Sequence, residues 1–212
     1  MSMEEGPSII SGTERQALRA DAARNARRIL DAAHVVLKGN PQASSEDIAR
    51  AAGLGVATLY RRFPTREDLI QGILWDIFER DIAPGLARAE QETDPREGVR
   101  ISFEAALSAA VRLGSPFPAG MTLEIAQTFV GPVSQMICRS QQQGLIRADL
   151  DPEKDTLRLL LMVLSVVPTF SPGSKGWNRY LRLVMDSLAL TPTEPLPPAE
   201  ASVDPFQRAK SQ

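Results

Sequence analysis

The sequence has very few of the side chains on which catalysis and metal binding most often depend. It contains one cysteine, Cys138, and one histidine, His34. A single cysteine excludes an internal disulfide and a thiolate metal cluster, and a single histidine leaves almost no choice of Ser-His-Asp set. The sequence also lacks a glycine-rich phosphate loop before a helix, an HExxH motif and a CxxC motif. We therefore expect no enzyme, no metal site and no cofactor.

Long hydrophobic runs are missing as well. The longest nearly uninterrupted apolar stretch, Leu159 to Val167, is far shorter than the roughly 18 to 20 residues that a membrane-spanning helix needs. The first residues, MSMEEGPSIISGTERQ, carry acids where a signal peptide would carry basic residues. The sequence thus predicts a cytoplasmic protein without membrane contact. Its 43% hydrophobic content is enough to fill one or two cores.

The charges are unevenly distributed along the chain. Between Ser11 and Arg66 there are ten basic and five acidic residues, a net charge of +5, whereas the whole chain carries −2 and the remainder therefore −7. A basic N-terminal module attracts the phosphates of nucleic acid even when the protein as a whole is acidic. The low overall charge is therefore no argument against a nucleic-acid partner.

Residues 44–66, SSEDIARAAGLGVATLYRRFPTR, have the pattern of a helix-turn-helix. Ser44 followed by Asp47 is a capping box, which predicts a helix start. Ile48 points inward in that helix. Gly53 follows it, at a position where the chain must turn through a positive φ that glycine adopts most easily.

The second helix of this motif has one apolar face and one polar face. Val56, Leu59 and Phe63 are spaced three and four residues apart toward the first helix. The other face carries hydroxyl and guanidinium groups, which suit a helix that enters a major groove and contacts phosphates on either side: Thr58, Tyr60, Arg61 and Arg62. Pro64 ends this helix, and Thr65 with Asp68 caps the next one. Arg66 would lie in its first turn, where free amides favour a phosphate.

This segment resembles the signature of the TetR family of transcriptional regulators from Asp47 to Leu69, and Arg19 to Leu37 resemble that family's first helix. The resemblance implies that Thr58, Tyr60 and Arg66 contact the DNA backbone and that the base-reading surface contains Val56, Ala57 and Arg61. Gly55 departs from the Ser or Thr that often caps the recognition helix in the family, and Arg66 stands in place of a frequent Lys. Because glycine is an acceptable cap, we still expect the helix to form.

The predicted DNA-binding set combines the residue pattern with the resemblance. It comprises Ser44, Val56, Ala57, Thr58, Tyr60, Arg61, Arg62 and Arg66. A simpler interpretation of the motif is a helical corner whose arginines form a solvated face. The alternative function is a helical ligand carrier or protein-interaction module whose basic end binds an acidic partner. We expect instead a ligand-responsive transcriptional regulator, a repressor, that binds an inverted-repeat operator as a homodimer.

The rest of the chain predicts an all-α protein with two domains. We expect a flexible arm over 1–16, a three-helix DNA-binding domain over 17–64, a helical ligand-binding and dimerisation domain over 65–190 and a disordered tail over 191–212. Asp81 to Pro95 resembles a junction of turn residues, and Pro95 to Leu113 a helix. The segment from Met121 to Gln143, interrupted by Gly131-Pro132, is either two helices or one kinked helix. Asp151-Pro152 predicts the start of the next helix.

Two apolar sets in the second domain predict a dimer interface and an effector site. The helix that follows Asp151 is apolar on nearly every side, so we expect a second copy of the chain to cover part of it and of the last helix. The expected interface is Leu157, Leu160, Leu161, Leu164, Trp177, Tyr180, Leu181, Val184 and Leu188. Rings and thioethers suited to a small apolar effector are Trp75, Phe78, Phe103, Phe117, Met121, Phe129, Met136 and Met162. Each of these residues taken alone suits an ordinary core better than a pocket, and it is the resemblance to the TetR family that implies a pocket.

Overall fold

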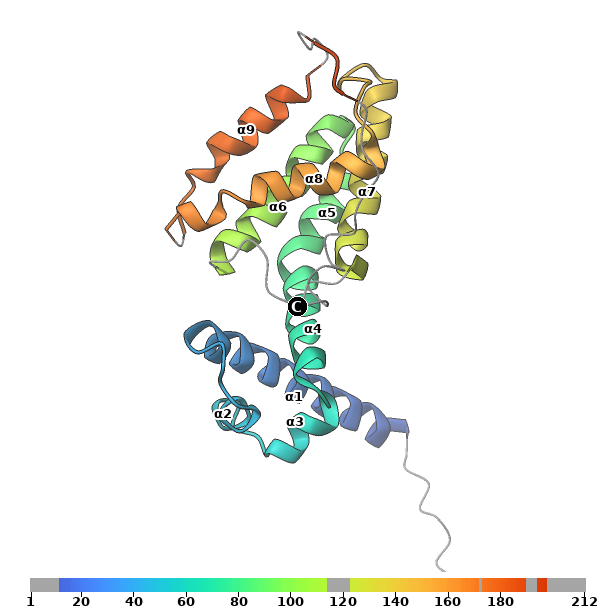
Figure 1. Ribbon diagram of the computed structural model, residues 1–212. Coiled ribbons are helices and arrows are strands. Elements are labelled where there is room, and N and C mark those ends of the chain that lie inside the picture. Colours follow the sequence, from blue (N-terminus) through green and yellow to red (C-terminus); the bar gives the residue numbers. More distant parts are fainter. Residues whose placement is uncertain (1–11, 114–122, 172, 190–193, 198–212) are drawn as a thin grey trace, which may run out of the picture. The chain divides into compact units, whose positions relative to one another are not determined.

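The structure is a computed structural model that describes residues 12–113, 123–171, 173–189 and 194–197 (Figure 1). Every regular element within these ranges is a helix, so the predicted all-α fold is confirmed. The chain divides into two compact units, Met1–Ile73 and Leu74–Gln212. In the described part of the chain, no helix combines the length and the apolar character needed to cross a bilayer.

The first unit is a small helical domain built on a long first helix. It contains α1 (Gly12–Gly39), α2 (Ser45–Ala51), α3 (Val56–Arg62) and the beginning of α4 (Arg66–Ile77). Its core includes Ile29 and Ala33 of α1 and Ile48 of α2, all completely buried. Apolar residues at helical spacing therefore form the core of this unit, as the periodicity predicts.

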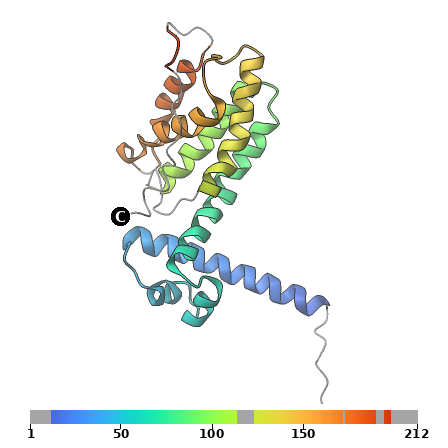
Figure 2. The ribbon, with the colours of Figure 1, turned by 45° about the vertical axis from the view of Figure 1, so that its right-hand side comes forward.

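Helix α1 begins earlier than expected. Residues 12–16, which the sequence assigned to a flexible arm, are helical, and the remainder of that predicted arm lies outside the described residues. Thr13 to Arg19 contain neither proline nor glycine, so nothing in the local sequence ends the helix there. Figure 2 shows the first turns of α1 extending beyond α2 and α3.

The boundary between the units lies within α4 and not at residue 64, where the sequence suggested it. Gly72 explains this position, because a Cβ atom there would lie 2.7 Å from the Phe63 ring and 3.0 Å from the Leu30 side chain. The beginning of α4 therefore packs closely against side chains of the first unit.

The second unit is a helical bundle. After the end of α4 it contains a π-helical turn η1 (Phe78–Ile82), α5 (Ala83–Glu90), α6 (Pro95–Leu113), α7 (Leu123–Gln142), α8 (Pro152–Leu164), a 3-10 turn η2 (Val167–Thr169) and α9 (Trp177–Ser187). Helix α6 contacts α5, α7, α8 and α9. Its residues Val99, Phe103 and Leu107 are completely buried, so α6 supplies the centre of this core.

Three local expectations for the second unit can be compared with its helices. The predicted helix from Pro95 to Leu113 is confirmed. The expected junction from Asp81 to Pro95 was wrong, since residues 83–90 form α5; Pro84 lies in the first turn of that helix, where its missing N–H costs nothing. The segment around Gly131-Pro132 is one continuous helix, α7, with Pro132 inside it.

The predicted cap at Asp151 is also present. The Asp151 carboxylate accepts hydrogen bonds from the backbone N–H groups of Glu153 at 3.1 Å and of Lys154 at 3.0 Å. These bonds satisfy two of the free amides at the start of α8. Helix α8 then ends at Leu164, and the apolar stretch Leu159 to Val167 continues beyond it to the first residue of η2.

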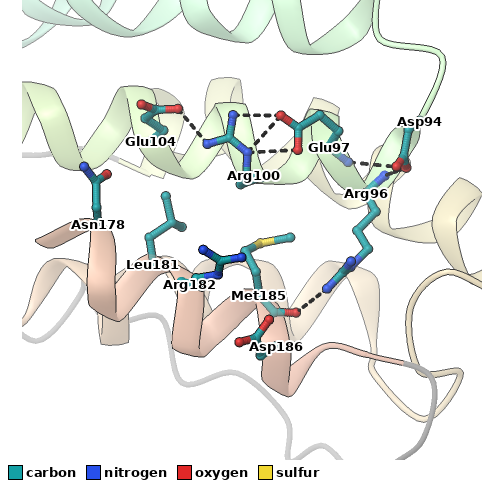
Figure 3. Close-up of a pocket in the computed structure, with 10 residues that line it drawn as sticks. All are labelled: Asp94, Arg96, Glu97, Arg100, Glu104, Asn178, Leu181, Arg182, Met185 and Asp186. Carbon is teal, nitrogen blue, oxygen red and sulfur yellow. Dashed lines mark hydrogen bonds and ion pairs between the residues drawn. The ribbon is translucent and has the colours of Figure 1, made fainter.

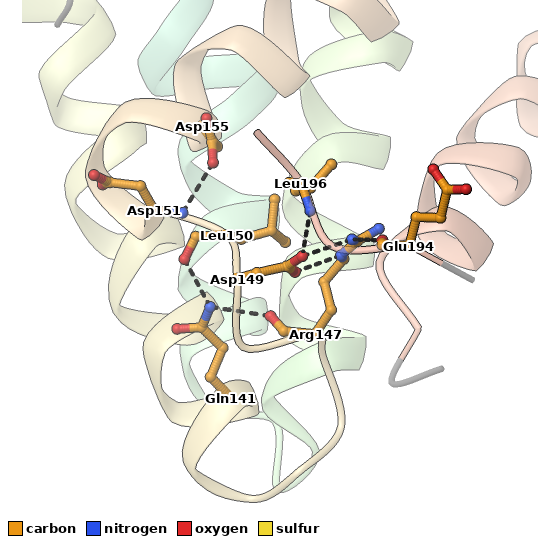
Figure 4. A network of polar contacts seen from close by, with 8 residues as sticks. All are labelled: Gln141, Arg147, Asp149, Leu150, Asp151, Asp155, Glu194 and Leu196. Carbon is orange, nitrogen blue, oxygen red and sulfur yellow. Dashed lines mark hydrogen bonds and ion pairs between the residues drawn. The ribbon is translucent and has the colours of Figure 1, made fainter. Parts of the chain in front are cut away.

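Part of the predicted tail contacts the turn between α7 and α8. Residues 194–197 are described, and the Leu196 N–H donates to Oδ2 of Asp149 at 2.8 Å (Figure 4). Arg147 forms an ion pair with Asp149 at 2.6 Å and donates from Nη2 to the Glu194 carbonyl at 3.1 Å. This part of the expected disordered tail is therefore held by a polar network. The other residues of that segment lie outside the described ranges.

We expect that Asp149→Ala releases residues 194–197. The Arg147 guanidinium and then the Leu196 N–H hold the pKa of the Asp149 carboxyl well below its ordinary value. A carboxyl with a depressed pKa contributes its stabilisation above its unfolded pKa of about 4 and loses it as the pH falls through the lower, folded value. The contact should therefore persist unchanged from pH 8 to pH 5.

Hydrogen exchange of the peptide that contains Leu196 measures this release. Amide exchange of this peptide should be faster in Asp149→Ala than in the parent at every pH from 5 to 8. Glu153→Ala, an exposed acidic residue close by in the chain, is the matched control and should leave the peptide unchanged. Equal protection of Leu196 in all three proteins would contradict the assignment.

Candidate nucleic-acid interface

The interface begins with the predicted capping box at the start of α2. The Asp47 N–H donates to Ser44 Oγ at 3.1 Å, and the Ser44 N–H donates to Asp47 Oδ2 at 3.3 Å. The Ser44 hydroxyl also donates to the same carboxylate at 2.8 Å. The hydrogen bonds that the Ser44 hydroxyl and then the Ser44 N–H donate to the Asp47 carboxylate lower the pKa of Asp47. Ser44 is exposed, but its hydroxyl is occupied as a helix cap in this structure.

The turn between α2 and α3 has the backbone that its glycine predicts. Gly53 has φ +64, and its N–H donates to the Arg50 carbonyl at 3.0 Å. Arg28 of α1 lies directly against this turn and donates from Nη2 to the Ala52 carbonyl at 2.8 Å. A Cβ atom on Gly53 would lie 2.9 Å from that nitrogen. Glycine is therefore favoured here by its φ and by the contact with Arg28.

Helix α3 is short and is held mainly by two apolar side chains. Leu59 and Phe63 are buried, whereas Val56, which the spacing also placed toward the first helix, is exposed at the helix start. Gly55 is the N-cap and makes no side-chain capping bond. Helix α3 therefore forms without the hydroxyl cap that the resemblance would have favoured.

The outer face of α3 brings most of the predicted DNA-binding residues together. Tyr60 is 46% exposed, and Ala57, Arg61 and Arg62 are also exposed, while Thr58 is half-buried. A hollow of about 230 Å³ lies between this face and α1, lined by Ala22, Asn25, Ala26, Ile29, Thr58, Arg61 and Arg62. A hydroxyl, an amide and two guanidinium groups around one hollow can all donate to phosphate oxygens.

Asn25 was missed by the sequence analysis. It belongs to α1, more than thirty residues before the arginines that it accompanies around the hollow. Nothing in its local sequence distinguishes it from other polar residues on α1. Only the packing of α1 against α3 brings it to this face.

Arg66 does not extend freely from the start of α4. Its Nη1 donates to the Ala43 carbonyl at 2.9 Å and its Nη2 to the Pro41 carbonyl. The predicted cap of this helix is present, because the Asp68 N–H donates to Thr65 Oγ1 and the Thr65 N–H to Asp68 Oδ2, both at 3.0 Å. Two donors of Arg66 thus bond to the loop between α1 and α2 in this structure, and its expected phosphate contact stays a prediction.

The predicted effector-site residues that the structure describes differ in their burial. Phe103, Phe129 and Met136 are buried, and the rings of Phe103 and Phe129 lie 6.3 Å apart. Trp75 and Phe78 form an edge-to-face pair with ring centroids 5.8 Å apart. Met162 is 54% exposed and cannot belong to a buried pocket in this structure. Phe117 and Met121 lie outside the described residues.

A cleft of about 540 Å³ lies between α6 and α9, and its lining is charged (Figure 3). Arg100 lies between Glu97 at 2.7 Å and Glu104 at 2.8 Å, and these carboxylates, Glu97 first, raise its pKa. Arg96 donates from Nη2 to the Met185 carbonyl at 3.0 Å and so joins α6 to α9. The lining contains none of the residues predicted for the apolar effector site.

The predicted dimer residues divide into two groups. Five of them are buried within this single chain: Leu160, Leu164, Trp177, Leu181 and Leu188. These residues are covered by their own chain, so they are not available as a surface. Leu157, Leu161 and Val184 are half-buried and Tyr180 is exposed. Two further apolar residues, Met162 and Leu183, are each 54% exposed. The sequence analysis assigned neither of them to the interface and placed Met162 in the effector site.

Comparisons with known proteins agree with this geometry. Residues 29–73 match the family model described as bacterial regulatory proteins, tetR family. The HTH-type transcriptional repressor LfrR of Mycolicibacterium smegmatis is 37% identical over 92 residues, which are 43% of this chain and 42% of that relative. The chain thus matches less than half the length of this relative.

Solved structures extend the likeness of fold to most of the chain. The TetR family transcriptional regulator PfmR from Thermus thermophilus superposes with a TM-score of 0.60 at 22% identity, covering 76% of this chain and 97% of PfmR. AibR, solved in complex with isovaleryl coenzyme A and operator DNA, superposes with a TM-score of 0.59 at 19% identity, covering 78% of this chain and 98% of AibR. Residues 29–73 thus match the tetR-family model, and the fold of most of the chain is similar to that of these solved regulators.

Proposed function

We propose that this protein is a ligand-responsive transcriptional repressor that binds an inverted-repeat operator as a homodimer. The observation that carries the proposal is the outer face of α3, where Tyr60, Arg61 and Arg62 are exposed opposite the buried Leu59. A helix with donors on one side and an apolar anchor on the other can lie in a major groove while its domain contacts the flanking phosphates.

The surrounding charge and the relatives support the same proposal. The segment from Ser11 to Arg66 carries ten basic against five acidic residues, which favours association with DNA. LfrR is a transcriptional repressor and AibR has been solved with operator DNA. A regulator of this kind acts on DNA in the cytoplasm and has no need of catalysis, so we propose a non-enzymatic cytoplasmic protein.

We also propose a small apolar molecule as the effector. AibR, with its bound isovaleryl coenzyme A, is an example of a fold relative that takes a small molecule. Phe103, Phe129 and Met136 are packed together in this structure, so a molecule that entered between α6 and α7 would meet apolar side chains, which favours a neutral and largely apolar effector. Such an effector needs to favour the non-binding state by only about 2 to 3 kcal/mol to change operator occupancy substantially.

Selection of duplexes from a random library with the full chain tests the function. We expect an inverted repeat to be enriched, and its affinity to fall steeply with salt because several phosphates are neutralised. Arg61→Ala, if Arg61 reaches a base, should weaken binding to the selected duplex by about 1 to 3 kcal/mol and relax the sequence preference at one position of each half-site. Tyr60→Phe should weaken binding about equally on selected and scrambled duplexes.

The control is Arg88→Ala, which removes an exposed arginine from α5 in the second unit. It should bind the selected duplex as the parent does. Failure of the parent to enrich any sequence, with binding to acidic polymers of every kind instead, would favour the alternative in which the basic unit binds an acidic partner.

A further inference from the structure

We propose that Arg28 and Arg66 are positioning residues for α3, and that they act on backbone carbonyls and not on DNA phosphates. The inference rests on the proposed function, since it assigns how the DNA-reading helix is held. Each guanidinium bonds to a loop next to α2: Arg28 to the turn that leads into α3, and Arg66 to the loop between α1 and α2.

Arg28 holds the chain immediately before α3. Its Nη2 lies 2.8 Å from the Ala52 carbonyl and 3.5 Å from the Gly53 carbonyl. Ala52 is the C-cap of α2, and its carbonyl, like the others at a helix end, has no partner in the helix. A charged donor from α1 supplies that partner, and charge-assisted bonds of this kind are stronger than neutral ones.

Arg66 holds the chain immediately after α3. It is the first residue of α4, and its two terminal nitrogens bond to two different carbonyls, those of Ala43 and Pro41. Ala43 is buried, so its carbonyl belongs to a loop that packs into the domain. The planar fork of arginine can hold two carbonyls at once, whereas the single ammonium of lysine is a point donor on a flexible stem.

Helix α3 needs such support because little else fixes its orientation. It has seven residues, no side-chain N-cap, and one buried residue, Leu59, within its own length. A short helix anchored only by Leu59 and by Phe63 just after it can tilt, and a small misplacement removes the geometry that base contacts require. Arg28 before it and Arg66 after it restrain both flanking segments.

The alternative assignment is a direct phosphate contact, which is what the sequence predicts for Arg66. The two roles differ in salt dependence. Loss of one phosphate contact lowers the slope of log affinity against log salt by about 0.9 and weakens binding to every duplex alike. Loss of a positioning residue weakens binding to the selected duplex more than to a scrambled one, because only base contacts need an accurately oriented helix.

The experiment compares Arg28→Gln, Arg66→Gln and Arg66→Lys with the parent, each as the full chain. Arg62→Gln, on the exposed face of α3, is the reference for a phosphate contact, and Arg27→Gln removes an exposed neighbouring charge from α1. The probes are a duplex selected by the parent from a random library and a scrambled duplex of the same composition. Hydrogen exchange of α3, measured without DNA, reports the restraint directly.

We expect Arg28→Gln and Arg66→Gln to lose about tenfold of the affinity for the selected duplex, with binding to the scrambled duplex within about twofold of the parent. For both variants, the slope of log affinity against log salt should stay within about 0.3 of the parent's slope. The slope for Arg62→Gln should be smaller than the parent's by about 0.9. Exchange in α3 should accelerate in both variants and in Arg66→Lys, which keeps the charge but not the fork. Arg27→Gln should leave that exchange unchanged.

Two results would overturn the proposal. One is a loss of about 0.9 in salt slope for Arg66→Gln with α3 exchange unaltered; the other is an Arg66→Lys variant that equals the parent in affinity and exchange. If the parent itself selects no duplex, the proposed function fails. Hydrogen exchange of α3 without DNA still decides whether the two arginines restrain that helix. Arg66→Lys retains a charged donor nitrogen, so it keeps the test usable if a glutamine variant does not fold.

Discussion

Leu183→Glu is expected to convert the proposed dimer to a folded monomer. Leu183 of α9 and Met162 of α8 are each 54% exposed in the single chain, so a partner can cover them without rearrangement. A stable interface buries about 1,200 to 2,000 Å² in total, and an unpaired carboxylate within it costs several kcal/mol. Because one half-site alone holds one α3 weakly, affinity for an inverted repeat should fall by about a hundredfold or more.

Leu164→Glu should give a different result although it lies on the neighbouring helix α8. Leu164 is 5% exposed within its own chain, so a carboxylate there would be buried in the core and should unfold the second unit. Asn178→Glu, at an exposed polar position of α9, controls for added charge and should remain dimeric. Sedimentation and circular dichroism separate the outcomes. A Leu183→Glu dimer with normal operator binding would place the interface elsewhere.

Phe103→Ala is expected to reduce the free energy of unfolding of the second unit by about 3 to 5 kcal/mol. Phe103 is completely buried, and its ring lies 6.3 Å from that of Phe129. Removing the ring from a packed core loses its transfer free energy and leaves a cavity. Urea denaturation followed by tryptophan fluorescence of Trp177, which is buried in the same unit, measures the change.

The loss of unfolding free energy in Phe103→Ala also tests the predicted effector site. A ring that borders an open pocket has fewer packing partners, so its removal would cost much less than removal from a filled core. Gln127→Ala, at an exposed position of α7, is the control and should change stability by no more than about 0.5 kcal/mol. A loss of under about 1 kcal/mol for Phe103→Ala would contradict close packing and would support an effector pocket at this position.

Some elements of this protein could be predicted from short segments of its chain. The capping box of Ser44 and Asp47, the positive φ of Gly53 and the cap at Asp151 are all present where the sequence indicated them. Each depends on hydrogen bonds or dihedral preferences within three or four residues. The polar and apolar faces of α3 follow equally from helical spacing. Local interactions are therefore sufficient to predict the helix-turn-helix.

Other features depend on which segments meet in space. Spacing shows that α8 and α9 are strongly apolar, yet only the packing of this bundle decides that Leu164 and Leu181 are buried by their own chain while Met162 and Leu183 face outward. The same limit explains α5, where Pro84 looked like part of a turn but lies in the first turn of a helix that packs against α6.

The arginines show the distinction most clearly. The helical pattern places Arg61, Arg62 and Arg66 near one another in the chain, and a local argument treats all three as donors to phosphate. In the folded domain the first two remain exposed, while the donors of Arg66 reach the Pro41 and Ala43 carbonyls more than twenty residues away. A guanidinium bonds to whichever acceptors the fold brings within about 3 Å of it, and those acceptors are set by tertiary packing and not by neighbouring residues.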